Sequence, residues 1–106
     1  MKSLLIPLVD VRVTVYRGEA EWPRFVSVAK EHGAIIDDEP PEGDTGRSLE
    51  GWVWISDTAG RGTLIHELSH LIDNLMNLLV SQDTEFRAYL TEWTFERFLT
   101  WFEEIH

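Results

Sequence analysis

Five consecutive residues carry the side chains that could do chemistry: His66-Glu67-Leu68-Ser69-His70, which has the form H-E-x-x-H. On a helix, four residues turn by about 400°, so the two imidazoles lie on one face, one turn apart. Both can then bind one zinc ion, at about 2.0–2.1 Å. Glu67 lies about 100° further round, where it can reach a water on that metal without being a ligand. We therefore predict a zinc site with Glu67 as general base.

The residues around the motif predict the helix that must position it. Thr63 is a suitable N-cap for a helix that begins at Leu64 and ends near residues 77–80. Apolar side chains at helical spacing bury its other faces: Leu64, Ile65, Leu68, Leu71, Ile72, Leu75 and Leu79. A polar stripe, His66, His70, Asp73 and Asn77, is left over. The alternative is a pair of surface histidines, but the intervening glutamate favours a metal site.

The remaining elements follow from hydrophobic patterning. Residues 8–16 alternate as in a half-buried strand, with residues 1–7 as its lead-in, and 34–36 and 52–56 are short strands. Helices are expected from Trp22 to about Lys30 and from about Thr84 to Glu103, the latter capped by Asp83 or Thr84. Residues 37–48 read as an exposed loop. We predict one α+β domain over 1–106, with a mixed sheet of two or three strands and three helices, the motif on the second.

Composition excludes several classes of function. The chain has 106 residues, no cysteine and a formal net charge of -10. Disulfides and thiolate sites are therefore excluded, and binding to nucleic acid or to an anionic membrane is not expected. No apolar run reaches the length of about 18 residues that a membrane span needs, so we expect a cytoplasmic protein.

The segment Thr63 to His70 resembles the active-site helix of zincin metallopeptidases. The strand 52–56 matches the position of the substrate-aligning edge strand in that family, and Glu85-Phe86-Arg87-Ala88 is similar to the third-ligand helix of its glutamate branch, the gluzincins. The combination also resembles small H-E-x-x-H proteins encoded by phages. The resemblance covers about residues 51–98. It implies that His66, His70 and Glu85 bind Zn²⁺, and that Glu67 is the catalytic base.

Geometry leaves the third ligand open. In a tight antiparallel helix pair, His70 faces about residue 93, and Glu85 lies roughly 10 Å further along the axis. Glu92 and Glu96 share the face of Glu85 and stay candidates. Asp73 is better suited to hold a ligand imidazole than to bind the metal. Tyr89 is a candidate donor to a developing oxyanion, or simply a residue at the core edge.

Three functions compete on this basis. The first is a minimal zinc-dependent peptidase acting on a peptide or protein. The second is a non-catalytic zinc-binding protein that binds or inhibits a partner. The third, favoured only by the charge, is a mimic of nucleic acid. Aromatic residues of the C-terminal helix, among them Trp93, Phe98 and Trp101, either form a dimer or partner surface or pack over the small sheet.

Overall fold

The computed structural model describes residues 1–7, 9–79 and 82–104. Its elements in chain order are β1 (Lys2–Ile6), β2 (Val11–Arg17), a 3₁₀ turn (Glu19–Glu21), α1 (Trp22–Glu31), β3 (Gly46–Leu49), β4 (Trp52–Ile55), α2 (Arg61–Leu78) and α3 (Thr84–Glu104). The predicted α+β class is confirmed, with three α-helices and the motif on the second. No helix among the described residues is both long and apolar enough to cross a membrane.

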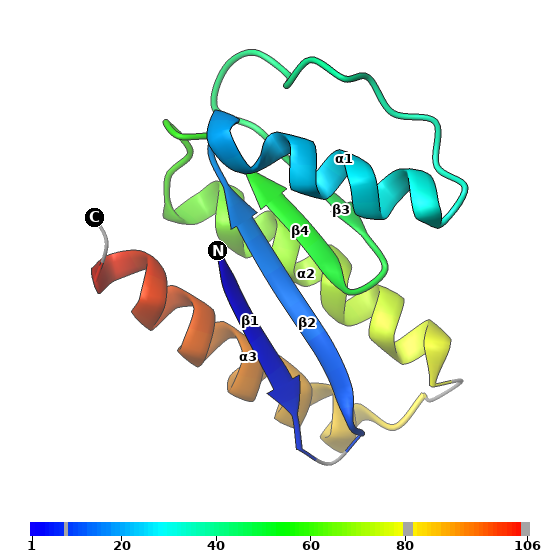
Figure 1. Cartoon of the computed structure of the whole chain (residues 1–106). Coiled ribbons are helices and arrows are strands. Elements are labelled where there is room, and N and C mark those ends of the chain that lie inside the picture. The colour runs from blue at the N-terminus through cyan, green and yellow to red at the C-terminus, as the bar shows by residue number, and fades with distance from the viewer. Residues whose placement is uncertain (8, 80–81, 105–106) are drawn as a thin grey trace.

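The sheet has four strands in the order β1-β2-β4-β3, one more than the upper prediction (Figure 1). β1 and β3 run antiparallel to their neighbours, while the central pair, β2 and β4, is parallel. Two of these strands, β1 and β3, were not predicted, and the strand predicted at 34–36 is absent. The first of them is β1. Its residues were predicted only as the lead-in to strand 8–16, but Asp10, with φ of 54°, turns the chain into a hairpin. Residue 8, where that strand was predicted to begin, lies outside the described residues.

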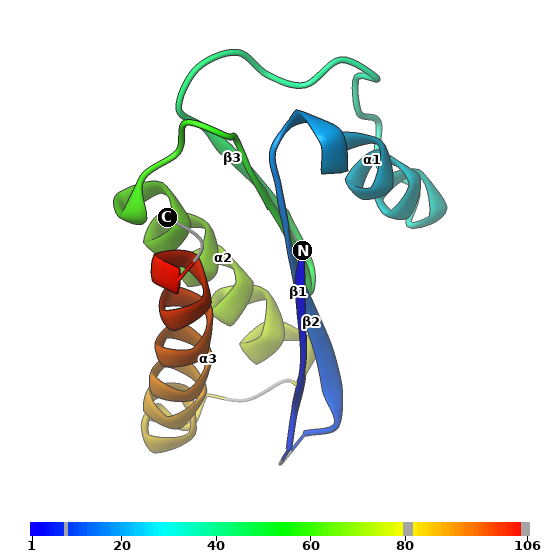
Figure 2. The ribbon, with the colours of Figure 1, turned by 60° about the vertical axis from the view of Figure 1, so that its left-hand side comes forward.

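Helices cover both faces of the sheet. Seen edge-on, α1 lies on one face and α2 and α3 lie side by side on the other (Figure 2). The larger core fills the α2–α3 side, with Val13, Val15 and Ile55 of the sheet against Leu68 of α2 and Phe98 of α3. Two ion pairs, Arg61–Glu103 and Asp73–Arg87, link α2 to α3, and their order along the two helices shows that the helices are antiparallel.

The tryptophans explain how so small a chain encloses many aromatic rings. Trp22 of α1 and Trp54 of β4 are 2% and 1% exposed and meet edge to face, with ring centroids 4.7 Å apart. On α3, Phe98 and Phe102 are buried, and Phe86, Tyr89, Trp93, Phe95 and Trp101 pack against the larger core. Of the two alternatives given for the aromatic residues of the C-terminal helix, the structure thus shows packing onto the core of the chain itself. A partner surface formed by these aromatics stays a prediction.

The largest differences from the sequence-based expectation lie before β4. Residues 34–36 form no strand, and Ile35 is fully exposed. The predicted loop 37–48 instead contributes most of β3, which pairs with β4 from Gly46↔Ile55 to Leu49↔Trp52. The edge strand is therefore β3, and the strand predicted at 52–56 lies inside the sheet, because β2 occupies its other side.

Candidate metal centre

Leucines hold α2 against the sheet and turn its histidines outward. Leu64, Leu68, Leu71 and Leu75 are at most 1% exposed. His66 and His70 lie about 200° and 240° round the helix from Leu64, on the opposite side. The helix begins at Arg61 with Gly60 as N-cap, so the predicted cap, Thr63, lies inside the first turn. In this earlier first turn, Arg61 pairs with Glu103 of α3.

The two imidazoles are already at the spacing that a shared metal requires. Their Nε2 atoms are 3.2 Å apart, and the rings meet at 81° with centroids 4.8 Å apart. A tetrahedral zinc ion bound at about 2.0–2.1 Å needs the two nitrogens about 3.3–3.4 Å apart. His66, Glu67 and His70 together place one ligand atom each within 4.8 Å of one another. The cluster can therefore bind a metal ion.

Glu67 differs from the histidines in being buried. Its side chain is 8% exposed, against 68% for that of His66, and Oε1 lies 3.9 Å from His66 Nε2. The other oxygen, Oε2, is buried without a hydrogen-bond partner in the described part of the chain. A buried carboxylate oxygen without a partner is costly. A cation or a bound water beside it would remove that cost, so the donor set fits a divalent metal.

The edge strand fixes the position of Glu67. A side chain at Gly46 of β3 would place its Cβ 2.6 Å from Glu67 Cγ, so only glycine leaves room there. Sequence analysis missed Gly46, because it lies in a stretch rich in glycine and proline. The signal that could have found it is the short turn Glu50-Gly51 between Leu49 and Trp52, which is typical of a hairpin.

Between β3 and the start of α2 lies a hollow of about 420 Å³ that is lined by two motif residues, His66 and Glu67, but not by His70. It is lined by Asp44, Thr45, Gly46, Arg47, Gly62, Thr63, His66 and Glu67. We call it the β3–α2 hollow. Nearly every side chain in it is polar, and the buried carboxylate of Glu67 lies on its wall.

The carboxylates of α3 do not belong to the metal-competent group on α2. The buried face of α3 is formed by Leu90, Thr94, Phe98 and Phe102. Glu85, Glu92 and Glu96 lie about 200–240° round from Leu90, and all three are exposed. None of them belongs to the metal-competent group found among the described residues. The structure thus does not bring Glu85 to the histidines, and its role as third ligand stays a prediction.

Asp73 and Tyr89, the two other residues predicted to belong to the site, have neighbours outside it. Asp73 pairs with Arg87 of α3 and not with an imidazole. Tyr89 is half-buried against the larger core, and it is not among the residues that line the β3–α2 hollow. Its predicted role as an oxyanion donor is therefore not supported by its present position.

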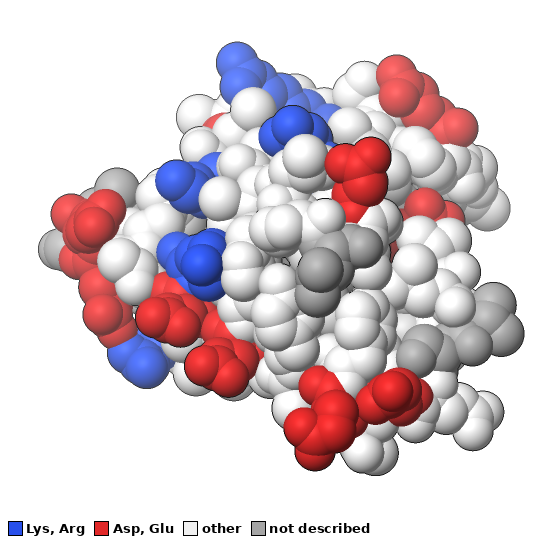
Figure 3. Space-filling model, turned by 90° about the horizontal axis from the view of Figure 1, so that it is seen from below, with Lys and Arg blue, Asp and Glu red and all other residues white. Residues whose placement is uncertain are grey.

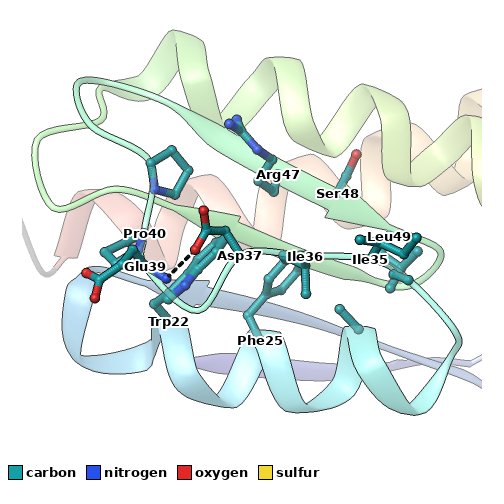
Figure 4. A pocket seen from close by; sticks show the side chains of 13 residues that line it. Trp22, Phe25, Ile35, Ile36, Asp37, Glu39, Pro40, Arg47, Ser48 and Leu49 are labelled. Carbon is teal, nitrogen blue, oxygen red and sulfur yellow. Dashed lines mark hydrogen bonds between the residues drawn. The ribbon is translucent and has the colours of Figure 1, made fainter.

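A second cavity, of about 470 Å³, lies on the opposite face of the sheet (Figure 4). Trp22 and Phe25 of α1 form one wall, Ile36 and Leu49 another, and the loop that carries Asp37 and Glu39 closes one side. This cavity contains no member of the metal-competent cluster, so it is separate from the candidate centre.

Acidic and basic side chains are both present on the face of the molecule shown in Figure 3. On the face in Figure 3, acidic side chains form separate groups with uncharged surface between them, and basic side chains lie among them. That face lacks the continuous acidic array that a mimic of nucleic acid would present.

Comparison with protein-family models, with curated proteins and with solved structures gave no match to this chain. The interpretation of the site therefore depends on its own geometry.

Proposed function

We propose that this chain is a minimal zinc-dependent peptidase of the zincin type. His66 and His70 hold the metal, and Glu67 is the general base. The observation that carries the proposal is the pair of Nε2 atoms 3.2 Å apart beside a buried carboxylate whose Oε2 has no partner among the described residues. A structural histidine pair on a surface helix would not require that carboxylate.

A divalent metal bound there would polarise a carbonyl group and lower the pKa of a water. The protein's own contribution is proton transfer and positioning. Glu67 lies next to the metal-binding nitrogens without joining them, so its carboxylate can accept a proton from the attacking water and pass it to the leaving amine. Burial by Gly46 excludes solvent from one side of that carboxylate.

The substrate we propose is an extended segment of peptide or protein. β3 is an edge strand, and one of its edges is unpaired within the described sheet. A peptide that pairs with this edge would run beside the β3–α2 hollow, since Gly46 and Arg47 belong to both. Main-chain hydrogen bonds would then align the scissile carbonyl, as in other cases of strand addition.

The test is cleavage of an unbiased peptide library by the zinc-loaded protein, with Glu67→Gln as the matched variant. This substitution keeps the volume of the side chain and removes its basicity. We expect the variant to bind zinc normally and to lose about 10²–10⁴-fold in rate. Zinc binding with no cleavage by the unaltered protein would instead favour the alternative, a non-catalytic metal-binding protein that acts on a partner.

A further inference from the structure

The β3–α2 hollow contains one carboxylate besides Glu67, that of Asp44. Asp44 is exposed, and no hydrogen bond or ion pair of its carboxylate is found within the described part of the chain. It lies two residues before Gly46, which lies against Glu67. Like Glu85, Asp44 is outside the group of ligand atoms that already lie within 4.8 Å of one another, but unlike Glu85 it lines the hollow together with His66 and Glu67. Its side chain is free to turn toward a ligand there.

The backbone beside Asp44 is firmly held. Thr45 donates its N–H to Ser56 Oγ at 3.2 Å and accepts the N–H of Ser56 at 2.9 Å. The next residue, Gly46, pairs with Ile55 in the sheet and lies against Glu67. The backbone next to Asp44 is therefore already fixed where it lines the hollow, so ordering its side chain on a ligand costs side-chain entropy but little backbone entropy.

Arg47 does not compete strongly for that carboxylate. Its Nη1 donates to Thr45 Oγ1 at 3.0 Å and to the Gly46 carbonyl at 2.7 Å, so its guanidinium is folded back onto its own strand. The buried group in this hollow that lacks a partner among the described residues is Oε2 of Glu67. The hollow thus brings together the imidazole of His66, a buried carboxylate and a free carboxylate, a set of donors that suits a cation. His70, whose Nε2 lies 3.2 Å from that of His66, adds the second imidazole from the next turn of α2.

We propose that Asp44 is the third protein ligand of the metal held by His66 and His70. This inference rests on the proposed function and deepens it. Catalytic zinc sites have three protein ligands and one open position. With Asp44 as the third, Glu67 stays free as the base, and the carboxylates of α3 are not needed. The metal then joins the segment just before β3 to α2, whereas a ligand from α3 would join the two helices.

The experiment is a metal titration of the full chain, with zinc affinity measured by competition with a chromophoric chelator. The Co²⁺-loaded protein is also recorded by absorption, because its visible bands report the ligand set. Asp44→Asn is compared with Glu85→Gln, each an exchange of an acid for its amide at an exposed site. Circular dichroism establishes that both variants keep the fold.

We expect Asp44→Asn to weaken zinc binding by more than the ~10–100-fold typical of losing an outer-shell partner, and to change the Co²⁺ bands. Glu85→Gln should bind as the unaltered protein does. The reverse result, loss in Glu85→Gln alone, would overturn the inference and leave the proposed function standing. Unchanged binding in both variants would also overturn it. Failure of the unaltered protein to bind metal would refute the proposed function itself.

Discussion

Gly46→Ala tests the contact between the edge strand and the candidate base. The new Cβ would lie 2.6 Å from Glu67 Cγ and 3.0 Å from the Trp54 carbonyl oxygen, whereas ordinary contacts begin at 3.4 Å. The strand cannot move away easily, because β3 is hydrogen-bonded to β4. Glu67 must therefore shift by at least about 0.4 Å, the difference between 3.0 and 2.6 Å, and by about 0.8 Å to reach an ordinary contact of 3.4 Å.

Gly46→Ala should lower both the stability of the fold and the rate of peptide cleavage. Overpacking of this kind costs about 1–3 kcal/mol. In a domain of this length, each kcal/mol lowers the melting temperature by roughly 4–8 °C. Displacing a catalytic group by ~1 Å can cost about 10²-fold in rate. Zinc affinity should change less, because the three atoms nearest to the new Cβ belong to Glu67 and Trp54 and not to a histidine.

The matched control is Gly62→Ala, in the first turn of α2. Gly62 lines the same hollow, but a Cβ there would meet nothing within 4 Å. Alanine is favoured over glycine in a helix by about 0.5–1 kcal/mol, so this variant should be at least as stable as the unaltered protein. Thermal unfolding, a zinc isotherm and peptide cleavage are measured on both. A Gly46→Ala protein with unchanged stability and rate would refute the reasoning.

Three further predictions concern groups outside the hollow. Thr94→Val should raise the melting temperature, because the buried Thr94 Oγ1 has no hydrogen-bond partner among the described residues and its burial costs about 1–3 kcal/mol. Asp83→Ala should lower the free energy of unfolding in urea by about 0.5–2 kcal/mol, because Asp83 Oδ1 accepts the backbone N–H of Glu85 and Phe86 at 2.9 and 3.1 Å. Burial raises the pKa of Tyr16 above its usual 10.0, so the unfolded chain ionises first and stability should fall as pH rises past that value. Urea titrations across this range should show the fall, and Tyr16→Phe should remove that part of it.

Much of the fold could be read from local signals. The helices at Trp22, Arg61 and Thr84 follow from hydrophobic spacing and, for the last, from the cap at Asp83. The spacing of His66 and His70 also predicted how close their ring nitrogens lie, because a helix repeats with a fixed pitch. Such features depend only on residues that are near in sequence.

What the sequence could not predict depends on long-range pairing. β3 is a short, polar segment, and it becomes a strand only because β4 offers it an edge. The burial of Glu67 likewise comes from Gly46, twenty-one residues earlier in the chain. The position of Glu85, the predicted third ligand, also depends on long-range packing. The face that Glu85 presents is set by how Leu90 and Phe98 pack, which helical spacing on α3 alone does not determine.

The most direct test of the central claim is metal content, measured by mass spectrometry on untagged protein purified without chelator. The double variant His66→Ala, His70→Ala is purified in parallel. We predict about one zinc ion per chain in the unaltered protein and none in the variant, as a single shared site requires. Absence of zinc from both proteins, even after zinc is added, would contradict the existence of the metal centre.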